Sequence, residues 1–206
     1  EADVTFLVEG VRAEDKKGLT FSFTYQTDFL HLYKKYVNKI DFAIFPSEYI
    51  KEFYDLGNEG KILSFGSPKF CVELCKDKIY KKYSLNHNTK KALVIWPKPR
   101  DLNRVDMGMI LQSIKNSGYE ILVKTRAKDP VPSNLRGDHC FEDYSWFPHT
   151  TCELLKISDV AINFGSTAIE ECVMYETPVL NFDIKPDIRH GHRLKHRVGF
   201  EFLWML

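Results

Sequence analysis

The chain has 206 residues, of which 44% are hydrophobic and 14% aromatic, and its formal net charge at pH 7 is +1. This composition is that of an ordinary globular protein and excludes a disordered chain. Because the net charge is close to zero, there is no general basic field, so we expect no nucleic-acid partner and at most peripheral membrane contact. The length suffices for one large domain or two small ones.

The five cysteines are odd in number and lack paired CxxC spacing; they are Cys71, Cys75, Cys140, Cys152 and Cys172. This pattern favours buried free thiols in a reducing cytosol over a disulfide framework or a zinc site. No apolar run approaches the roughly 20 residues of a membrane span, and no signal peptide is visible. We therefore expect a soluble, cytoplasmic protein.

The first half of the chain alternates short apolar stretches with helical ones. The patterns predict strands at 4–8, 19–24, 41–45 and 61–65, and helices at 30–40, 48–56 and 70–83. A polar, Asn-rich break follows at residues 86–89. It is the candidate boundary between two domains, residues 1–88 and 89–206.

The second half continues the alternation. Strands are predicted at 92–96, 119–124, 139–141 and 160–164, with helices at 105–117 and 150–157. Strands that alternate with helices across short loops imply parallel sheets covered on both faces, and hence an α/β fold. In such sheets ligands bind outside the carboxyl ends of the strands, so the functional residues should follow strand ends.

Residues 158–181 carry the strongest signal. They comprise a buried strand, a tight Gly165-Ser166-Thr167 turn, a helix running to about Tyr175 and a strand that opens at Pro178. Backbone N–H groups and the positive helix end meet at the turn, which suits a phosphate or diphosphate. The alternative interpretation is a plain helix start with Ser166 or Thr167 as the N-cap.

This order of strand, Gly/Ser/Thr turn, Glu seven residues before Pro, and Pro-Val-Leu resembles the donor-nucleotide motif of GT-B glycosyltransferases and UDP-N-acetylglucosamine 2-epimerases. In those families the turn holds the diphosphate and that Glu binds the ribose hydroxyls. The resemblance implies that Gly165, Ser166 and Thr167 bind the diphosphate, and that Glu171 rather than Glu170 binds the ribose. It also implies an α/β fold of two Rossmann-like parallel-sheet lobes of GT-B type. Because both chain ends are abrupt, we expect the first lobe to be truncated and the second nearly complete.

Two further segments resemble parts of the same superfamily. Residues 42–49 followed by 66–70 are similar to the end of the GT-B amino-terminal domain and its linker. Residues 94–101 resemble the strand-Pro-x-x-Arg-Asp segment of CDP-glycerol glycerophosphotransferases, which implies that Arg100 contacts the donor. Those enzymes carry a His-Pro pair and a Ser-Asp-Tyr-Ser-Ser turn where this chain has Lys124–Pro130 and Gly165–Thr167, so that branch is an alternative.

Other side chains are candidates for the donor site. Lys124 and Arg126 alternate along an extended segment, so both side chains leave the same side and can neutralise a diphosphate. A solvated charged loop is the alternative interpretation. Trp146 and Phe147 stand where related enzymes hold the nucleobase against an apolar loop, although aromatic packing on the sheet explains them equally well.

Catalysis needs a base for the acceptor hydroxyl and a positive environment for the leaving diphosphate. In the GT-B layout the base belongs to the first lobe, where Asp28 follows a strand end with His31 behind it. The alternative role of Asp28 is an N-cap for the next helix. His192 and His196 have metal-pair spacing without a nearby acidic ligand, so we expect no metal site. The resemblance likewise implies that no cofactor is required and that the nucleotide-diphosphate sugar is the donor substrate.

The sequence thus predicts a glycosyltransferase that moves a sugar from a nucleotide-diphosphate donor to a hydroxyl acceptor in surface polysaccharide or glycolipid synthesis. The acceptor partner is expected to be a saccharide or a lipid-linked molecule. Alternatives are a nucleotide-sugar epimerase, a CDP-glycerol-type glycerophosphotransferase and, in another class, a non-catalytic nucleotide-binding module. The sequence leaves the base, the sugar and the oligomeric state open.

Overall fold

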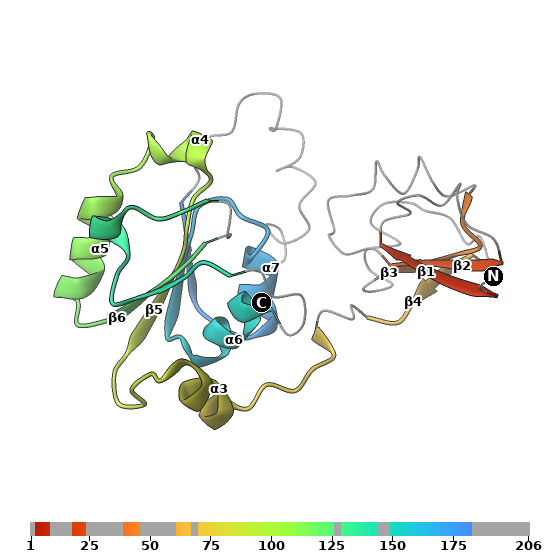
Figure 1. Cartoon of the computed structure of the whole chain (residues 1–206), viewed down its shortest axis with the longest axis horizontal. Helices are drawn as coiled ribbons and strands as arrows, with labels where there is room; N and C mark the ends of the chain where they lie inside the picture. Colours follow the sequence, from red (N-terminus) through yellow and green to blue (C-terminus); the bar gives the residue numbers. More distant parts are fainter. Residues whose placement is uncertain are drawn as a thin grey trace. The chain divides into compact units, whose positions relative to one another are not determined.

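A computed structural model of the chain describes residues 3–8, 18–23, 39–45, 61–66, 70–125, 129–143 and 149–182 (Figure 1). The described residues fall into two compact units, which divide between Cys71 and Val72. Each unit contains a parallel sheet.

The sheet of the first unit has four strands in the order β1-β2-β3-β4. Their bounds are β1 Val4–Val8, β2 Leu19–Phe23, β3 Phe42–Phe45 and β4 Ile62–Ser64. Because side chains alternate along a strand, the paired residues Phe6, Phe21 and Phe42 form a row on one face, with ring centroids 5.5 and 4.9 Å apart. A cluster of small and branched side chains forms the core of this unit; it contains Leu7, Ile40, Ala43, Phe45 and Ile62.

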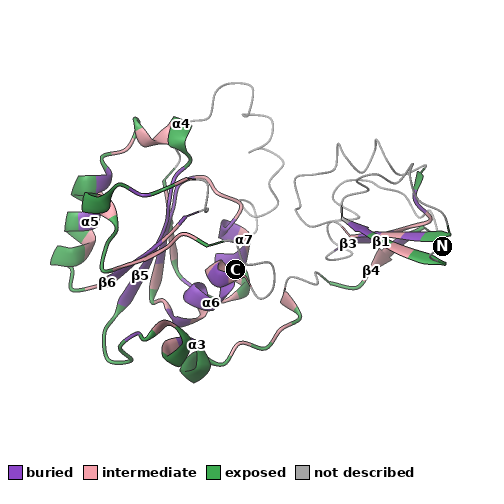
Figure 2. Ribbon diagram, viewed as in Figure 1, coloured by how far each residue is buried: buried purple, intermediate pink, exposed green. Residues whose placement is uncertain are grey.

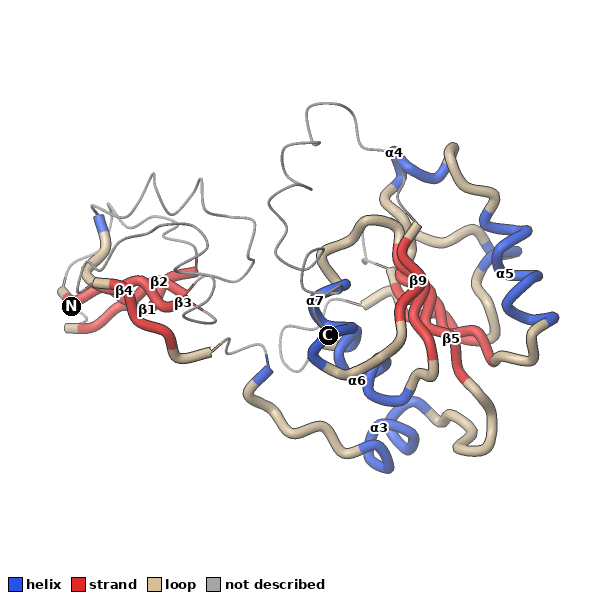
Figure 3. Tube along the Cα trace, turned by 180° about the vertical axis from the view of Figure 1, so that it is seen from behind, coloured by secondary structure: helices blue, strands red, loops and turns tan. Residues whose placement is uncertain are grey.

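The sheet of the second unit has five strands in the order β7-β6-β5-β8-β9. Their bounds are β5 Lys91–Ile95, β6 Glu120–Lys124, β7 His139–Phe141, β8 Val160–Asn163 and β9 Val179–Asn181. The helices are α3 Lys76–Tyr83, α4 Pro99–Leu102, α5 Met107–Asn116, α6 Thr150–Ile157 and α7 Ile169–Met174, with a 3₁₀ turn at Ser133–Leu135. Helix α5 covers one face of the sheet, and α3, α6 and α7 cover the other (Figures 1 and 3).

The central strand β5 explains why two helical layers form. All five of its residues are buried (Figure 2). Leu93 and Ile95 belong to the core beneath α3, α6 and α7, whereas Val94 belongs to the core beneath α5. A continuous apolar strand therefore has no solvent face, as expected for a parallel sheet between helices.

The predicted elements that fall in the described residues are found with the predicted type and order, and α6 matches residue for residue, whereas α4 and the 3₁₀ turn at Ser133–Leu135 were not predicted. The helix predicted at 70–83 begins only at Lys76, after an N-cap at Cys75. The candidate boundary near residue 88 lies in a loop of the second unit, whose first helix is α3. The predicted helices at 30–40 and 48–56 lie outside the described residues, except for residues 39 and 40 of the first.

The cysteines are all free, but they are not all buried. Cys152 and Cys172 lie in the core, whereas Cys71 and Cys75 are exposed because the helix expected to bury them starts after them. The expectation of buried thiols is therefore wrong for Cys71 and Cys75. In the described part of the chain, every helix is too short or too polar to cross a bilayer.

Candidate functional site

Two asparagine side chains hold the turn that follows β8. Asn163, the fully buried last residue of β8, donates from Nδ2 to Ser166 O at 3.0 Å and to Asn181 Oδ1 at 2.8 Å. Its own Oδ1 accepts from Ser166 N at 3.3 Å. Asn181 Oδ1 also accepts from Gly165 N at 3.4 Å. Asn163 and Asn181 are register partners in neighbouring parallel strands, so their side chains meet at the carboxyl edge of the sheet.

Some of the backbone N–H and C=O groups of the turn are therefore already hydrogen-bonded within the protein. The amides of Gly165 and Ser166 face the asparagines at long hydrogen-bond distances, and Ala168 N donates to Ser166 Oγ at 3.3 Å. Among the described residues, the amide of Thr167 has no hydrogen-bond partner. The donors most readily offered to an anion are this amide and the hydroxyls of Ser166 and Thr167.

Helix α7 begins at Ile169, one residue later than a Thr167 cap requires and two residues later than a Ser166 cap requires. Its N-cap is Ala168, and no side chain caps the helix. The prediction that Ser166 or Thr167 is the N-cap is therefore wrong: both residues belong to the turn before the cap, where Asn163 binds the N–H and the C=O of Ser166.

The two glutamates of α7 differ in burial. Glu171 is 7% exposed, whereas Glu170 is partly exposed, because adjacent helical residues point in different directions. Burial raises the pKa of the Cys172 thiol to about 12, and the negative charge of Glu171 contributes. Burial likewise raises the pKa of Tyr175, with contributions from Cys152 and Glu171. Glu171 is therefore the more buried of the two carboxylates and lies near Cys172 and Tyr175.

Arg100 follows the carboxyl end of β5. Pro99 starts the short helix α4, and the Arg100 side chain is 58% exposed, with Nε 3.4 Å from Asp101 Oδ2. This single long contact leaves most of the guanidinium fork open to solvent. Arg100 is therefore available to bind an anion at this edge.

Lys124, at the carboxyl end of β6, is in a different situation. Its side chain is 10% exposed, and Nζ donates to Asp143 O at 3.0 Å and lies 3.5 Å from Asp143 Oδ1. Burial lowers the pKa of Lys124, and the Asp143 carboxylate partly offsets this. The ammonium is thus already paired, which the sequence pattern did not indicate.

The sheet order decides which candidates share an edge. Since β6, β5, β8 and β9 are successive neighbours, Lys124, Arg100 and the Gly165–Thr167 turn all lie beyond the carboxyl ends of adjacent strands. The other candidate residues lie outside the described part of the chain: Asp28, His31, Arg126, Trp146, Phe147, His192 and His196. Within the described ranges, no three His, Cys, Asp or Glu side chains gather in the manner of metal ligands.

Sequence reasoning missed Asn163 and Asn181, although a signal for them exists. Both strands end in the dipeptide Asn-Phe, and the two phenylalanines, Phe164 and Phe182, stack with centroids 5.3 Å apart. The same dipeptide at the ends of two apolar strands indicates that the two strands are neighbours and that their asparagines meet at one edge of the sheet.

Several solved structures are similar to this chain. The wall teichoic acid polymerase TagF superposes with a TM-score of 0.62 at 16% identity, over 88% of this chain and 53% of that one. A TagF structure soaked with CDPG superposes with a TM-score of 0.61 at 17% identity, over 85% of this chain and 51% of that one. The chain has a GT-B-type fold.

Two further structures support the same fold. S. aureus MnaA with UDP has a TM-score of 0.55 at 12% identity, covering 87% of this chain and 57% of that one. UDP-GlcNAc 2-epimerase from Neisseria meningitidis, bound to UDP-GlcNAc, has a TM-score of 0.55 at 13% identity, covering 98% of this chain and 68% of that one. The chain spans about half the length of the TagF structures. No protein-family model matches the sequence, and no curated protein matches it.

Proposed function

We propose that this chain is the nucleotide-binding part of a GT-B-type glycosyltransferase, which transfers a sugar from a nucleotide-diphosphate donor to a hydroxyl of a surface polysaccharide or glycolipid. The observation that carries the proposal is the position of the Gly165–Thr167 turn and the buried Glu171. They follow β8 at the carboxyl edge of a parallel sheet whose fold resembles structures bound to UDP and UDP-GlcNAc.

The donor is placed by groups at this edge. The diphosphate lies at the turn, where Thr167 N–H and the two turn hydroxyls donate hydrogen bonds, and Arg100 provides a bidentate contact. Glu171 accepts hydrogen bonds from the ribose hydroxyls. Lys124 and Arg126 add positive charge after β6. Trp146 and Phe147 hold the nucleobase.

The chemistry requires few groups. Asp28, supported by His31, takes the proton of the acceptor hydroxyl, and the donor-side cations stabilise the departing nucleotide diphosphate. The proposal needs no cofactor, because turn dipoles and basic side chains balance the diphosphate charge. The acceptor is a saccharide or a lipid-linked hydroxyl.

Transfer of a glycerophosphate from CDP-glycerol is a second candidate. The TM-score to TagF is 0.62, against 0.55 to MnaA, and a TagF structure carries CDPG. Residues Pro97–Asp101, which resemble the strand-Pro-x-x-Arg-Asp segment of that branch, lie at the carboxyl end of β5 with Arg100 accessible. A nucleotide-sugar epimerase or a non-catalytic nucleotide-binding module would use the same site.

Isothermal titration calorimetry with UDP, CDP and GDP tests the proposal. We expect one nucleotide diphosphate to bind measurably, and the matching sugar or glycerol derivative to be consumed when a hydroxyl acceptor is added. Tighter binding of CDP with turnover of CDP-glycerol selects the second candidate. Binding without turnover selects the binding module, and absence of binding by all three nucleotides contradicts every version.

A further inference from the structure

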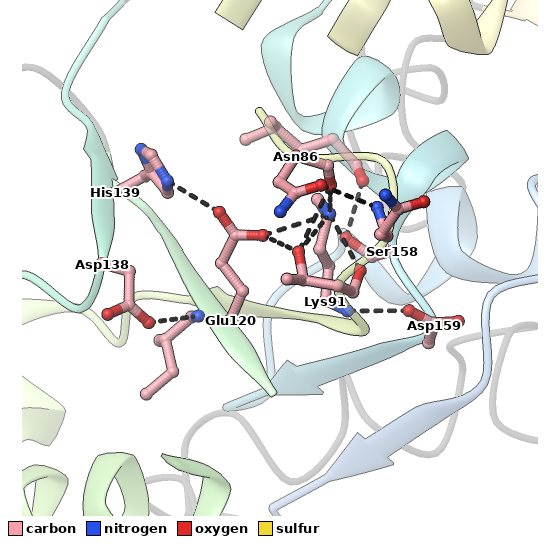
Figure 4. A network of polar contacts seen from close by, with 11 residues as sticks. Asn86, Lys91, Glu120, Asp138, His139, Ser158 and Asp159 are labelled. Carbon is pink, nitrogen blue, oxygen red and sulfur yellow. Dashed lines mark hydrogen bonds and ion pairs between the residues drawn. The ribbon is translucent and has the colours of Figure 1, made fainter. Parts of the chain in front are cut away.

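The opposite, amino edge of the second sheet holds a buried cation. Lys91, the first residue of β5, is 0% exposed, which is rare for a lysine. Its Nζ donates to Asn86 O, to Thr89 O at 2.9 Å and to Thr89 Oγ1 at 2.9 Å, and lies 3.1 Å from Glu120 Oε2. Figure 4 shows the side chain reaching into this ring of oxygens. Because the loop supplies three of these oxygens, the cation binds residues 86–89 to the sheet.

The Glu120 carboxylate is the counter-charge of the buried Lys91 ammonium. One oxygen pairs with Lys91 and accepts from Thr89 Oγ1, and the other lies 2.8 Å from His139 Nε2 (Figure 4). Asp159 is not a second counter-charge for the ammonium, because its carboxylate accepts from the backbone N of Lys91 at 2.7 Å. Asp138, which directly precedes β7, accepts from Ile121 N, and its Oδ1 lies 3.6 Å from Lys115 Nζ.

Helix α3 is attached at the same place. The Lys91 ammonium lies 5.0 Å from the centroid of the Tyr80 ring, and that ring stacks on His87 at 3.9 Å. From residues 76–90, only Ile79 and Leu85 enter the buried core, with Tyr80 and Tyr83 partly buried against it. This segment, which we call the α3 segment, therefore has little apolar attachment.

A second carboxylate holds the other side of α3. Glu153 of α6 is 5% exposed and accepts from Lys82 Nζ at 2.9 and 2.7 Å and from the Tyr83 hydroxyl. Helix α3 itself carries four lysines against one aspartate. The apolar packing of the helix is thus supplemented by direct contacts with Glu153 and by an indirect link to Glu120 through the Lys91 ammonium beside Tyr80.

We propose that the α3 segment is an acid-releasable latch, which detaches from the second unit as a local element when the Glu120 carboxylate is protonated. Protonation of Glu120 leaves the Lys91 ammonium buried without a counter-charge, which is strongly unfavourable. The four lysines of α3 then favour the solvated state.

The shift in the pKa of Glu120 agrees with release of the segment in acid. Burial raises the pKa of Glu120, but hydrogen bonds from Thr89, Lys91 and His139 outweigh it, and the pKa lies below its ordinary value of 4.5. Because the pKa of Glu120 is lowered, its carboxylate stabilises the folded segment at pH values above 4.5. This stabilisation is lost as the pH falls below 4.5 and through the lowered pKa. Release therefore belongs to the acid side of about pH 4.5.

Hydrogen exchange of the whole chain, followed by mass spectrometry, tests the latch. Glu120→Gln mimics the protonated carboxyl at neutral pH, and we expect the protection of residues 76–90 to fall at least about tenfold while β8 keeps its protection. Glu73→Gln is the matched control, because Glu73 is exposed beside the same helix. Unchanged protection, or an equal loss in β8, overturns the proposal.

Two further measurements decide the case if Glu120→Gln does not fold. As the pH is lowered stepwise from about 4.5, the unmodified chain should lose protection in the α3 segment before β8, once intrinsic exchange rates are taken into account. The double variant Lys91→Met/Glu120→Gln removes the buried cation together with its partner, so it should regain most of the lost protection. Simultaneous loss in both regions, or no recovery in the double variant, overturns the proposal.

Discussion

Asn163 Nδ2 donates a hydrogen bond of 2.8 Å to Asn181 Oδ1, which joins the carboxyl ends of β8 and β9 directly below the Gly165–Thr167 turn. The same Asn163 amide binds both backbone groups of Ser166. The conformation of the turn is therefore set by the sheet rather than by a capped helix, since α7 has no side-chain cap.

Asn163→Ala should lower the free energy of unfolding by about 1–3 kcal/mol, because Ser166 N–H, Ser166 C=O and Asn181 lose their buried partner. Urea denaturation followed by circular dichroism measures this. The control is Asn103→Ala, since Asn103 is exposed after α4. Equal effects of the two substitutions would show that the Asn163 amide is not a structural tie.

Gly137→Ala should be more costly than Gly118→Ala, although both glycines have positive φ, +65° and +81°. A Cβ at Gly137 meets Ile121 O and Ile121 Cγ2, each at 2.9 Å, whereas nothing lies within 4 Å of a Cβ at Gly118. Backbone strain of about 1 kcal/mol is common to both, and overpacking adds about 1–3 kcal/mol at Gly137. Thermal unfolding of the two variants checks the order, and a larger loss for Gly118→Ala would be inconsistent with the packing around β6.

Arg100→Gln should weaken binding of a nucleotide diphosphate more than Lys124→Gln. Arg100 is 58% exposed with one long contact, whereas the Lys124 ammonium is already paired with Asp143. Loss of a charge-assisted contact corresponds to about tenfold in affinity or more. Calorimetry of both variants measures the difference, and a larger loss for Lys124→Gln would mean that Lys124 leaves Asp143 when the nucleotide binds.

Thiol alkylation should separate the cysteines by burial. Cys71 and Cys75 are exposed and should react with iodoacetamide in the folded protein, whereas Cys152 and Cys172 should react only after unfolding. Burial raises the pKa of Cys172 to about 12, so this thiol stays protonated throughout the working pH range. Peptide mass spectrometry identifies the labelled residues. Native labelling of Cys172 as fast as that of Cys71 would contradict the packing of α7.

The sequence predicted the described elements well because most strands are apolar runs that end at Gly, Pro or Asn. The fully buried β5 and the alternation with helices were sufficient to predict parallel sheets. The partners of the site residues were harder to predict, since they depend on which strands are neighbours. Chain order does not show that β8 pairs with β5 and β9, so the contact of Asn163 with Asn181 stayed hidden.

Lys124 illustrates the same limit at the other side of the site. Its alternation with Arg126 predicted that both side chains leave one face of an extended segment, but Arg126 lies outside the described residues. The pattern contained no sign that Asp143, beyond the next strand, would pair with the ammonium. Local periodicity predicts where a side chain points, whereas its charge partner is set by the tertiary arrangement.

The central claim is that a nucleotide diphosphate binds beside α7, with Glu171 on the ribose. Calorimetric affinities of the unmodified chain, Glu171→Ala and the neighbouring control Glu170→Ala test it most directly. We expect Glu171→Ala to lower the affinity for the nucleotide diphosphate by about tenfold or more, while the affinity of Glu170→Ala stays close to that of the unmodified chain. Equal losses in the two variants, or no nucleotide binding by the unmodified chain, would contradict it.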